Sequence, residues 1–103
     1  MLKFEKVNKK FGPEFFSLSD LDFEIADGEF VFLTGPSGAG KTTILRLILR
    51  DLKPNSGKIT LDNLELGKLK SSQLPNLRQK VAMVFQDFRL LFDRTVFENI
   101  ALA

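Results

Sequence analysis

Apolar and polar residues alternate in two stretches near the start of the chain. In residues 2–7 and 21–25 most apolar side chains fall at every second position, and the positions between them are charged. This alternation is typical of strands that bury one face and expose the other. We therefore predict two strands of an antiparallel meander, with a loop over residues 8–13 and a turn at Asp27 and Gly28.

Two further stretches are apolar at consecutive positions. Residues 30–33 have the sequence Phe-Val-Phe-Leu, and residues 81–85 have the sequence Val-Ala-Met-Val-Phe. Short apolar runs without alternation are typical of strands that are buried on both faces, as in a sheet covered by helices. We predict that both stretches lie in a buried core sheet beside the meander.

Residues 42–50 carry apolar side chains at helical spacing, with Arg46 and Arg50 four positions apart on the opposite face. The predicted helix stops before residues 53–57, which are rich in turn formers. Residues 71–80 are a weaker helix candidate. The pattern of strands and helices together indicates an α/β fold.

The last third of the chain adds a short strand, a loop and the start of a helix. Residues 58–61 are predicted to form the strand, and residues 86–94 the loop. Thr95 and Glu98 match a capping box, so a new helix is predicted to begin at Thr95. A helix that starts so late favours the first part of a larger, incomplete domain, and a small domain with a frayed terminal helix is the alternative.

The amino-acid composition excludes several kinds of functional site. The 103 residues include no cysteine and no histidine, which excludes disulfides, histidine-based zinc sites and Ser-His-Asp catalysis. Fifteen Lys and Arg residues against 13 Asp and Glu give a net charge of +2, without a basic block that would indicate nucleic acid as a partner. No apolar stretch approaches the roughly 20 residues that span a bilayer, so we expect a cytoplasmic protein.

The clearest chemical motif is a glycine-rich loop between the apolar stretch 30–33 and the predicted helix. Residues 35–42 match G-x-x-x-x-G-K-[ST], and a chance match in a chain of this length has a probability of about 0.3%. Glycines let backbone N–H groups surround a phosphate, and the helix start adds partial positive charge. The sequence predicts a phosphate-binding loop made of Gly35, Pro36, Ser37, Gly38, Ala39, Gly40, Lys41, Thr42 and Thr43.

Three side chains of this loop have separate expected roles. Lys41 is expected to reach the β- and γ-phosphates, the Thr42 hydroxyl to bind Mg²⁺, and Thr43 to contact the α-phosphate. The motif indicates a nucleoside triphosphate but no particular reaction, because kinases, GTPases and transport ATPases share it.

Four more motifs accompany the loop in order along the chain. Residues 7–12 have the sequence Val-Asn-Lys-Lys-Phe-Gly, residues 27–30 Asp-Gly-Glu-Phe, residues 54–59 Pro-Asn-Ser-Gly-Lys-Ile and residues 83–86 Met-Val-Phe-Gln. With the phosphate loop, they resemble the N-terminal part of an ABC-type ATPase domain over essentially the whole chain. The resemblance implies the P-loop NTPase fold.

Within that family, one subgroup is most similar. Residues 32–41, 85–87 and 90–96 look like the ATP-binding subunits that work with a membrane protein in bacterial cell division. ATP-binding subunits of related exporters and importers are the alternative.

The resemblance also implies roles for two residues outside the phosphate loop. Phe11 occupies the position of an aromatic residue that stacks on adenine, and a core or rim phenylalanine is the alternative. Gln86 matches the Q-loop glutamine, whose side-chain oxygen reaches Mg²⁺ and the attacking water. We therefore expect ATP as the ligand, with Mg²⁺ held by Thr42 and Gln86.

Several parts of the family's catalytic machinery are absent from these 103 residues, namely its signature sequence, Mg²⁺-binding aspartate, catalytic glutamate and switch histidine. In this family ATP lies between two domains, so the resemblance implies a second copy as partner in a nucleotide-sandwich dimer. It also implies a transmembrane subunit, which would hold the protein at the inner face of the membrane. The 103-residue chain alone is expected to bind ATP without turnover.

Two interpretations from other classes compete with this one. Guanylate-kinase-like enzymes also have a Gly-Pro-Ser-Gly-Ala-Gly-Lys loop, but theirs lies close to the N-terminus, whereas here it begins only at Gly35. The other alternative is an interaction module that uses bound nucleotide to order its surface and does not hydrolyse it.

Overall fold

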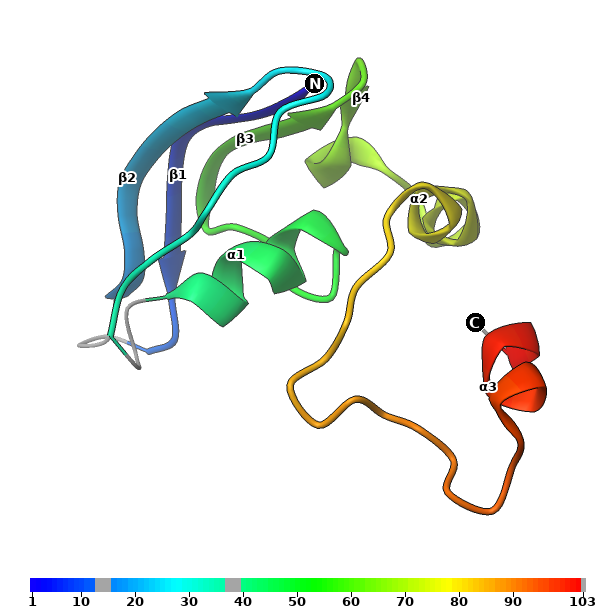
Figure 1. Cartoon of the computed structure of the whole chain (residues 1–103). Coiled ribbons are helices and arrows are strands. Elements are labelled where there is room, and N and C mark those ends of the chain that lie inside the picture. The colour runs from blue at the N-terminus through cyan, green and yellow to red at the C-terminus, as the bar shows by residue number, and fades with distance from the viewer. Residues whose placement is uncertain (13–15, 37–39, 103) are drawn as a thin grey trace.

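A four-stranded antiparallel sheet is the base of the fold (Figure 1). The computed structural model describes residues 1–12, 16–36 and 40–102. The strands are β1 (Leu2–Lys10), β2 (Phe16–Ile25), β3 (Ser56–Leu61) and β4 (Leu64–Glu65), in the order β2-β1-β3-β4. Because β1 pairs antiparallel with β2, the predicted meander is confirmed.

Strand β1 is longer than the alternating pattern predicts. The prediction of a loop is wrong for residues 8–10, which continue the strand. Polar contacts support this extension: the backbone N–H of Lys10 donates to Asn55 Oδ1 at 2.7 Å, and the Asn8 side-chain amide donates to Ser56 Oγ at 2.9 Å. These side chains lie outside the apolar pattern, so alternation alone could not place the end of the strand.

Helices follow the predicted segments closely. The helices of the described residues are α1 (Lys41–Ile48), α2 (Leu74–Lys80) and α3 (Val96–Leu102), with short 3₁₀ turns η1 (Leu66–Lys68) and η2 (Ser71–Gln73). The first helix ends two residues before the predicted end at Arg50, whose φ of 60° is left-handed. The capping box forms, because the backbone N–H of Glu98 donates to Thr95 Oγ1 at 3.1 Å.

One hydrophobic core joins the sheet to α1 and α2. Figure 1 shows α1 crossing one face of the sheet, and its buried residues Ile44 and Leu47 point into this core. The buried residues are Phe4, Val7, Leu18, Ile44, Leu47, Ile59, Leu66 and Leu77. Helix α3 contributes no buried residue and lies apart from the sheet in Figure 1.

The predicted buried core sheet is wrong for this structure. Residues 30–33 form no strand, and Phe30 and Phe32 are 84% and 80% exposed. Residues 81–85 also form no strand, and Val84 is 84% exposed. A strand buried on both faces needs hydrogen-bonded neighbours and cover on both sides, and the sheet ends at β2 and β4 without reaching either segment.

The described part of the chain contains no helix that is both long enough and apolar enough to cross a bilayer.

Candidate functional site

The site begins where the exposed segment after β2 leads into α1. Gly40 is the N-cap of α1 with φ 96° and ψ 8°, a left-handed conformation that glycine adopts without strain. Its carbonyl accepts a hydrogen bond from the Ile44 N–H at 3.0 Å, and no side chain among the described residues caps the helix. The first turn can therefore offer its N–H groups to an external acceptor.

The side chain of Lys41 folds back toward Gly35. Its ammonium donates to the carbonyl of Gly35, so the two ends of the predicted phosphate loop meet. An ammonium has three donors, and this contact uses one of them. The contact places a positive charge beside Gly35, where the ammonium can exchange a neutral carbonyl for a phosphate oxygen. The predicted contributions of Ser37, Gly38 and Ala39 lie outside the described residues.

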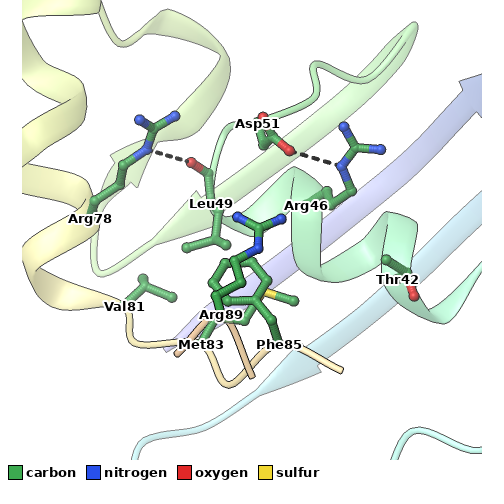
Figure 2. Close-up of a pocket in the computed structure, with 9 residues that line it drawn as sticks. All are labelled: Thr42, Arg46, Leu49, Asp51, Arg78, Val81, Met83, Phe85 and Arg89. Carbon is green, nitrogen blue, oxygen red and sulfur yellow. Dashed lines mark hydrogen bonds and ion pairs between the residues drawn. The ribbon is translucent and has the colours of Figure 1, made fainter. Parts of the chain in front are cut away.

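A cavity of about 410 Å³ lies between α1 and residues 81–89. Figure 2 shows Thr42 at one end of this cavity and Arg78 with Val81 at the other. The lining residues are Thr42, Arg46, Leu49, Asp51, Arg78, Val81, Met83, Phe85 and Arg89. The start of α1 and the chain on both sides of Gln86 thus meet around one cavity.

Positive charge dominates the polar part of this cavity wall. Arg46 Nε donates to Asp51 Oδ2 at 2.9 Å, and the Arg89 guanidinium lies 3.7 Å from the centroid of the Phe85 ring (Figure 2). Arg78 adds a third guanidinium, whereas Asp51 is the one carboxylate among the lining residues. A wall of this charge suits an anion more than a cation.

Gln86 is exposed and begins the turn over residues 86–89. It does not line the cavity, although its neighbour Phe85 does. The described residues contain no cluster of three or more His, Cys, Asp or Glu side chains that could hold a metal unaided. The oxygens of Thr42 and Gln86 still fit Mg²⁺, which prefers oxygen ligands and commonly completes its shell with water and substrate phosphates.

Phe11 follows β1 and is half-exposed, at 48%. The Lys9 ammonium lies 5.2 Å from the centroid of its ring. Sequence reasoning missed Lys9, although a spacing of two along an extended chain places two side chains on the same side. It also missed the stacking of Arg89 on Phe85, which depends on left-handed conformations at Phe88 and Arg89 that no sequence pattern indicated.

Comparison with known proteins gives consistent sequence matches. The profile of the ABC transporter family matches residues 18–103. The chain is 41% identical over 103 residues to the cell division ATP-binding protein FtsE of Bacillus subtilis and 42% identical over 102 residues to that of Escherichia coli. It is also 41% identical over 103 residues to the methionine import ATP-binding protein MetN of Helicobacter hepaticus.

These matches cover all or nearly all of this chain but only part of each relative. The chain spans 45% and 46% of the two FtsE proteins and 29% of MetN. It therefore corresponds to less than half the length of these relatives.

Solved structures match over the same extent. A dimeric ATP-binding cassette in a post-hydrolysis state with ADP and Pi bound superposes with a TM-score of 0.87 at 38% identity, covering 99% of this chain and 46% of that one. A dimeric bacterial ABC transporter cassette gives a TM-score of 0.89 at 35% identity with the same coverage. The likeness therefore includes the sheet, α1 and the segments that follow them.

Proposed function

Because this chain belongs to the ABC transporter family, we propose that it binds ATP with Mg²⁺ at the start of α1. The observation that carries the proposal is the geometry there. Gly40 is left-handed, the first-turn N–H groups lack a side-chain cap from the described residues, and the Lys41 ammonium lies against the Gly35 carbonyl. Backbone donors and one mobile cation that converge on one loop suit a polyphosphate.

Each residue of the proposed site has one role. Lys41 contacts the β- and γ-phosphates, and Thr43 the α-phosphate. Thr42 and Gln86 hold Mg²⁺, which neutralises phosphate charge when bound. Phe11 stacks on the adenine. Gly35, Pro36, Ser37, Gly38, Ala39 and Gly40 complete the loop around the phosphates.

The proposed biological role is that of an FtsE-like subunit. In this role ATP binding and hydrolysis are coupled to an FtsX-like transmembrane subunit in cell division, and the protein lies at the inner face of the cell membrane. Identities of 41–42% over the whole chain to FtsE proteins support this assignment. The importer alternative has support too, from the 41% identity to MetN. Family membership excludes the nucleotide kinase alternative.

A second copy of the complete ATPase domain is the proposed partner across the nucleotide. Support comes from the two similar solved structures, which are of one cassette and are both dimeric. Hydrolysis is proposed for the complete domain and its dimer, and the 103-residue chain binds ATP without turnover. The aspartate, glutamate and histidine that the family resemblance implies for turnover are not among its residues.

Substitution of Lys41 tests the binding site. Lys41→Ala removes a charge-assisted contact to the phosphates, so we expect ATP·Mg²⁺ affinity to fall by roughly 1.5 to 3 kcal/mol. Isothermal titration calorimetry measures the difference directly. Alanine is a good helix former, so α1 should persist, and circular dichroism verifies this.

Lys68→Ala is the matched control for charge. Lys68 is 80% exposed, lies on η1 and pairs with Glu65 at 3.3 Å, so its removal should leave ATP affinity unchanged. Equal affinities of the wild type and the folded Lys41→Ala variant would refute the proposed site.

A further inference from the structure

Lys9 is held between the ring of Phe11 and a second segment of the chain. Its ammonium lies 5.2 Å from the ring centroid and donates to the carbonyl of Lys53 at 2.8 Å. Phe11 nevertheless remains 48% exposed. The ammonium therefore approaches one face of the ring, while much of the ring surface stays open to a ligand.

The anchor for Lys9 is itself fixed to β1. Two residues beyond Lys53, the backbone N–H of Asn55 donates to the carbonyl of Asn8 at 2.8 Å. The side-chain oxygen of Asn55 in turn accepts from the backbone N–H of Lys10 at 2.7 Å. Lys9 thus connects the Phe11 ring to the segment that contains Lys53. Hydrogen bonds to Asn8 and Lys10, the residues on either side of Lys9, hold this segment against β1.

We propose that Lys9 is a positioning residue for base stacking on Phe11. The inference rests on the proposed function, because it presumes that Phe11 contacts the adenine of ATP. A cation over an aromatic ring attracts it electrostatically, and this cation is hydrogen-bonded at a defined place. The ring is therefore held in one orientation before the nucleotide arrives, which lowers the entropy cost of stacking.

A plain structural role for Lys9 makes a different prediction. If Lys9 only ties β1 to residue 53, its loss disturbs the whole nucleotide site and weakens every ligand alike. If Lys9 positions Phe11, its loss affects only ligands that carry a base. Inorganic triphosphate, which has no base, separates the two roles.

A double-mutant cycle on the full chain tests the proposal. Wild type, Lys9→Met, Phe11→Ala and the double variant are titrated with ATP·Mg²⁺ and with inorganic triphosphate·Mg²⁺. We expect Lys9→Met to weaken ATP binding about two- to fivefold and to leave triphosphate binding unchanged. In the Phe11→Ala background, Lys9→Met should change neither affinity.

Two further variants serve as controls. Lys9→Arg should retain ATP affinity, because a guanidinium can donate to a carbonyl and stack on a ring. Lys3→Met removes an exposed lysine of the same strand, which pairs with Glu5 at 3.4 Å, and should leave both affinities unchanged.

Four results would overturn the proposal. Equal losses for ATP and triphosphate in Lys9→Met, or equal losses of ATP affinity with and without Phe11, would assign Lys9 a structural role. Wild-type ATP affinity in Lys9→Met would exclude any role in stacking. If Phe11→Ala leaves the ratio of ATP to triphosphate affinity unchanged, the adenine contact itself is absent, and this part of the proposed function fails with it.

Discussion

Gly57 lies opposite a bulge in β1. The register between β1 and β3 shifts between Glu5 and Asn8, and the bulged residue Lys6 has a left-handed φ of 49°. Gly57 has φ 90°, and a Cβ built there would lie 2.3 Å from the Lys6 carbonyl oxygen and 2.5 Å from Val7 Cα. Both the left-handed backbone conformation at this position and the lack of room for a Cβ therefore require glycine.

Replacement of Gly57 tests this requirement. Gly57→Ala forces an alanine into left-handed backbone space and pushes two strands apart. We expect the free energy of unfolding to fall by about 2 to 5 kcal/mol. Urea denaturation measures the change. Gly67→Ala is the control, because no atom lies within 4 Å of its added Cβ, and it should change stability by no more than about 0.5 kcal/mol. Equal stability of the two variants would contradict the argument.

The hydrogen bonds of Arg50 could not be predicted from the spacing of residues in the sequence. Helical spacing places it on a face with Arg46, yet it lies beyond α1 and turns toward η1. Its Nη1 donates to the carbonyls of Leu66 at 2.7 Å and Leu69 at 3.1 Å. A contact with backbone acceptors far along the chain has no signature in the sequence, because any residue supplies a carbonyl.

At the level of elements, the side chain of Glu98 caps the start of α3. Arg94 Nη1 lies 3.1 Å from Glu98 Oε2, and the Thr95 hydroxyl donates to Glu98 Oε1 at 3.1 Å. Arg94 first, and then Thr95, lower the pKa of Glu98 below its ordinary value. The ionised form is thus favoured in the helix, and the N-terminal position of Glu98 adds to this through the helix dipole.

The sign of the pH effect follows from this lowered pKa. Glu98 stabilises α3 above the pKa that it has in the unfolded chain, and this contribution disappears as pH falls through the lowered pKa of the helix. We expect NMR titration to show the Glu98 pKa rising toward its ordinary value in Arg94→Ala and in Thr95→Ala. An unchanged Glu98 pKa in both variants would show that the capping contacts do not form in solution.

Elements with local amphipathic patterns could be predicted, and those that need distant partners could not. Residues 42–50 carry helical spacing within their own sequence, and α1 forms there. Residues 30–33 and 81–85 are apolar on both faces, a pattern that predicts burial but cannot supply the neighbouring strands that burial requires. In this structure the side chains of Val81, Met83 and Phe85 line the cavity beside α1, while Ala82 and Val84 are exposed.

In the candidate site, too, local features could be predicted and contacts between distant segments could not. Gly40 and Lys41 belong to one contiguous motif, and the structure brings that motif to the start of α1 as predicted. The Lys9 ammonium instead reaches the carbonyl of Lys53, 44 positions away along the chain. The position of these two residues was therefore predictable, whereas support from a distant segment required the fold.

At the scale of the whole molecule, the chain from Phe88 to α3 gathers many of the exposed large apolar side chains of the described residues. Phe92 is 95% exposed, and Leu90 and Leu91 are about half-exposed. A hollow of about 320 Å³ lies among the apolar side chains of this loop and those of α3. Asn99 fixes its shape, because its side-chain oxygen accepts from the Leu91 N–H at 2.8 Å and its amide donates to the Leu91 carbonyl at 3.1 Å.

Such a surface, with Arg94 at its edge, suits an amphipathic partner helix that has an acidic end. In Figure 1, α3 and the chain segment that leads into it lie away from the sheet, at the far side of the molecule from β2. A partner bound there would not occupy the start of α1. The alternative is that another part of the same domain covers these apolar side chains.

Leu91→Asp in the complete protein distinguishes these two occupants. A carboxylate in the hollow should exclude an apolar partner helix, because burial of an unpaired charge is costly. We expect the variant to lose co-purification with the proposed FtsX-like membrane subunit while it retains wild-type ATP affinity, because Leu91 lies outside the proposed nucleotide site. Retained ATP binding also reports that the variant is folded. Co-purification at the wild-type level would show that the partner binds elsewhere, and loss of ATP binding together with the partner would indicate that Leu91 belongs to the interior of the complete domain.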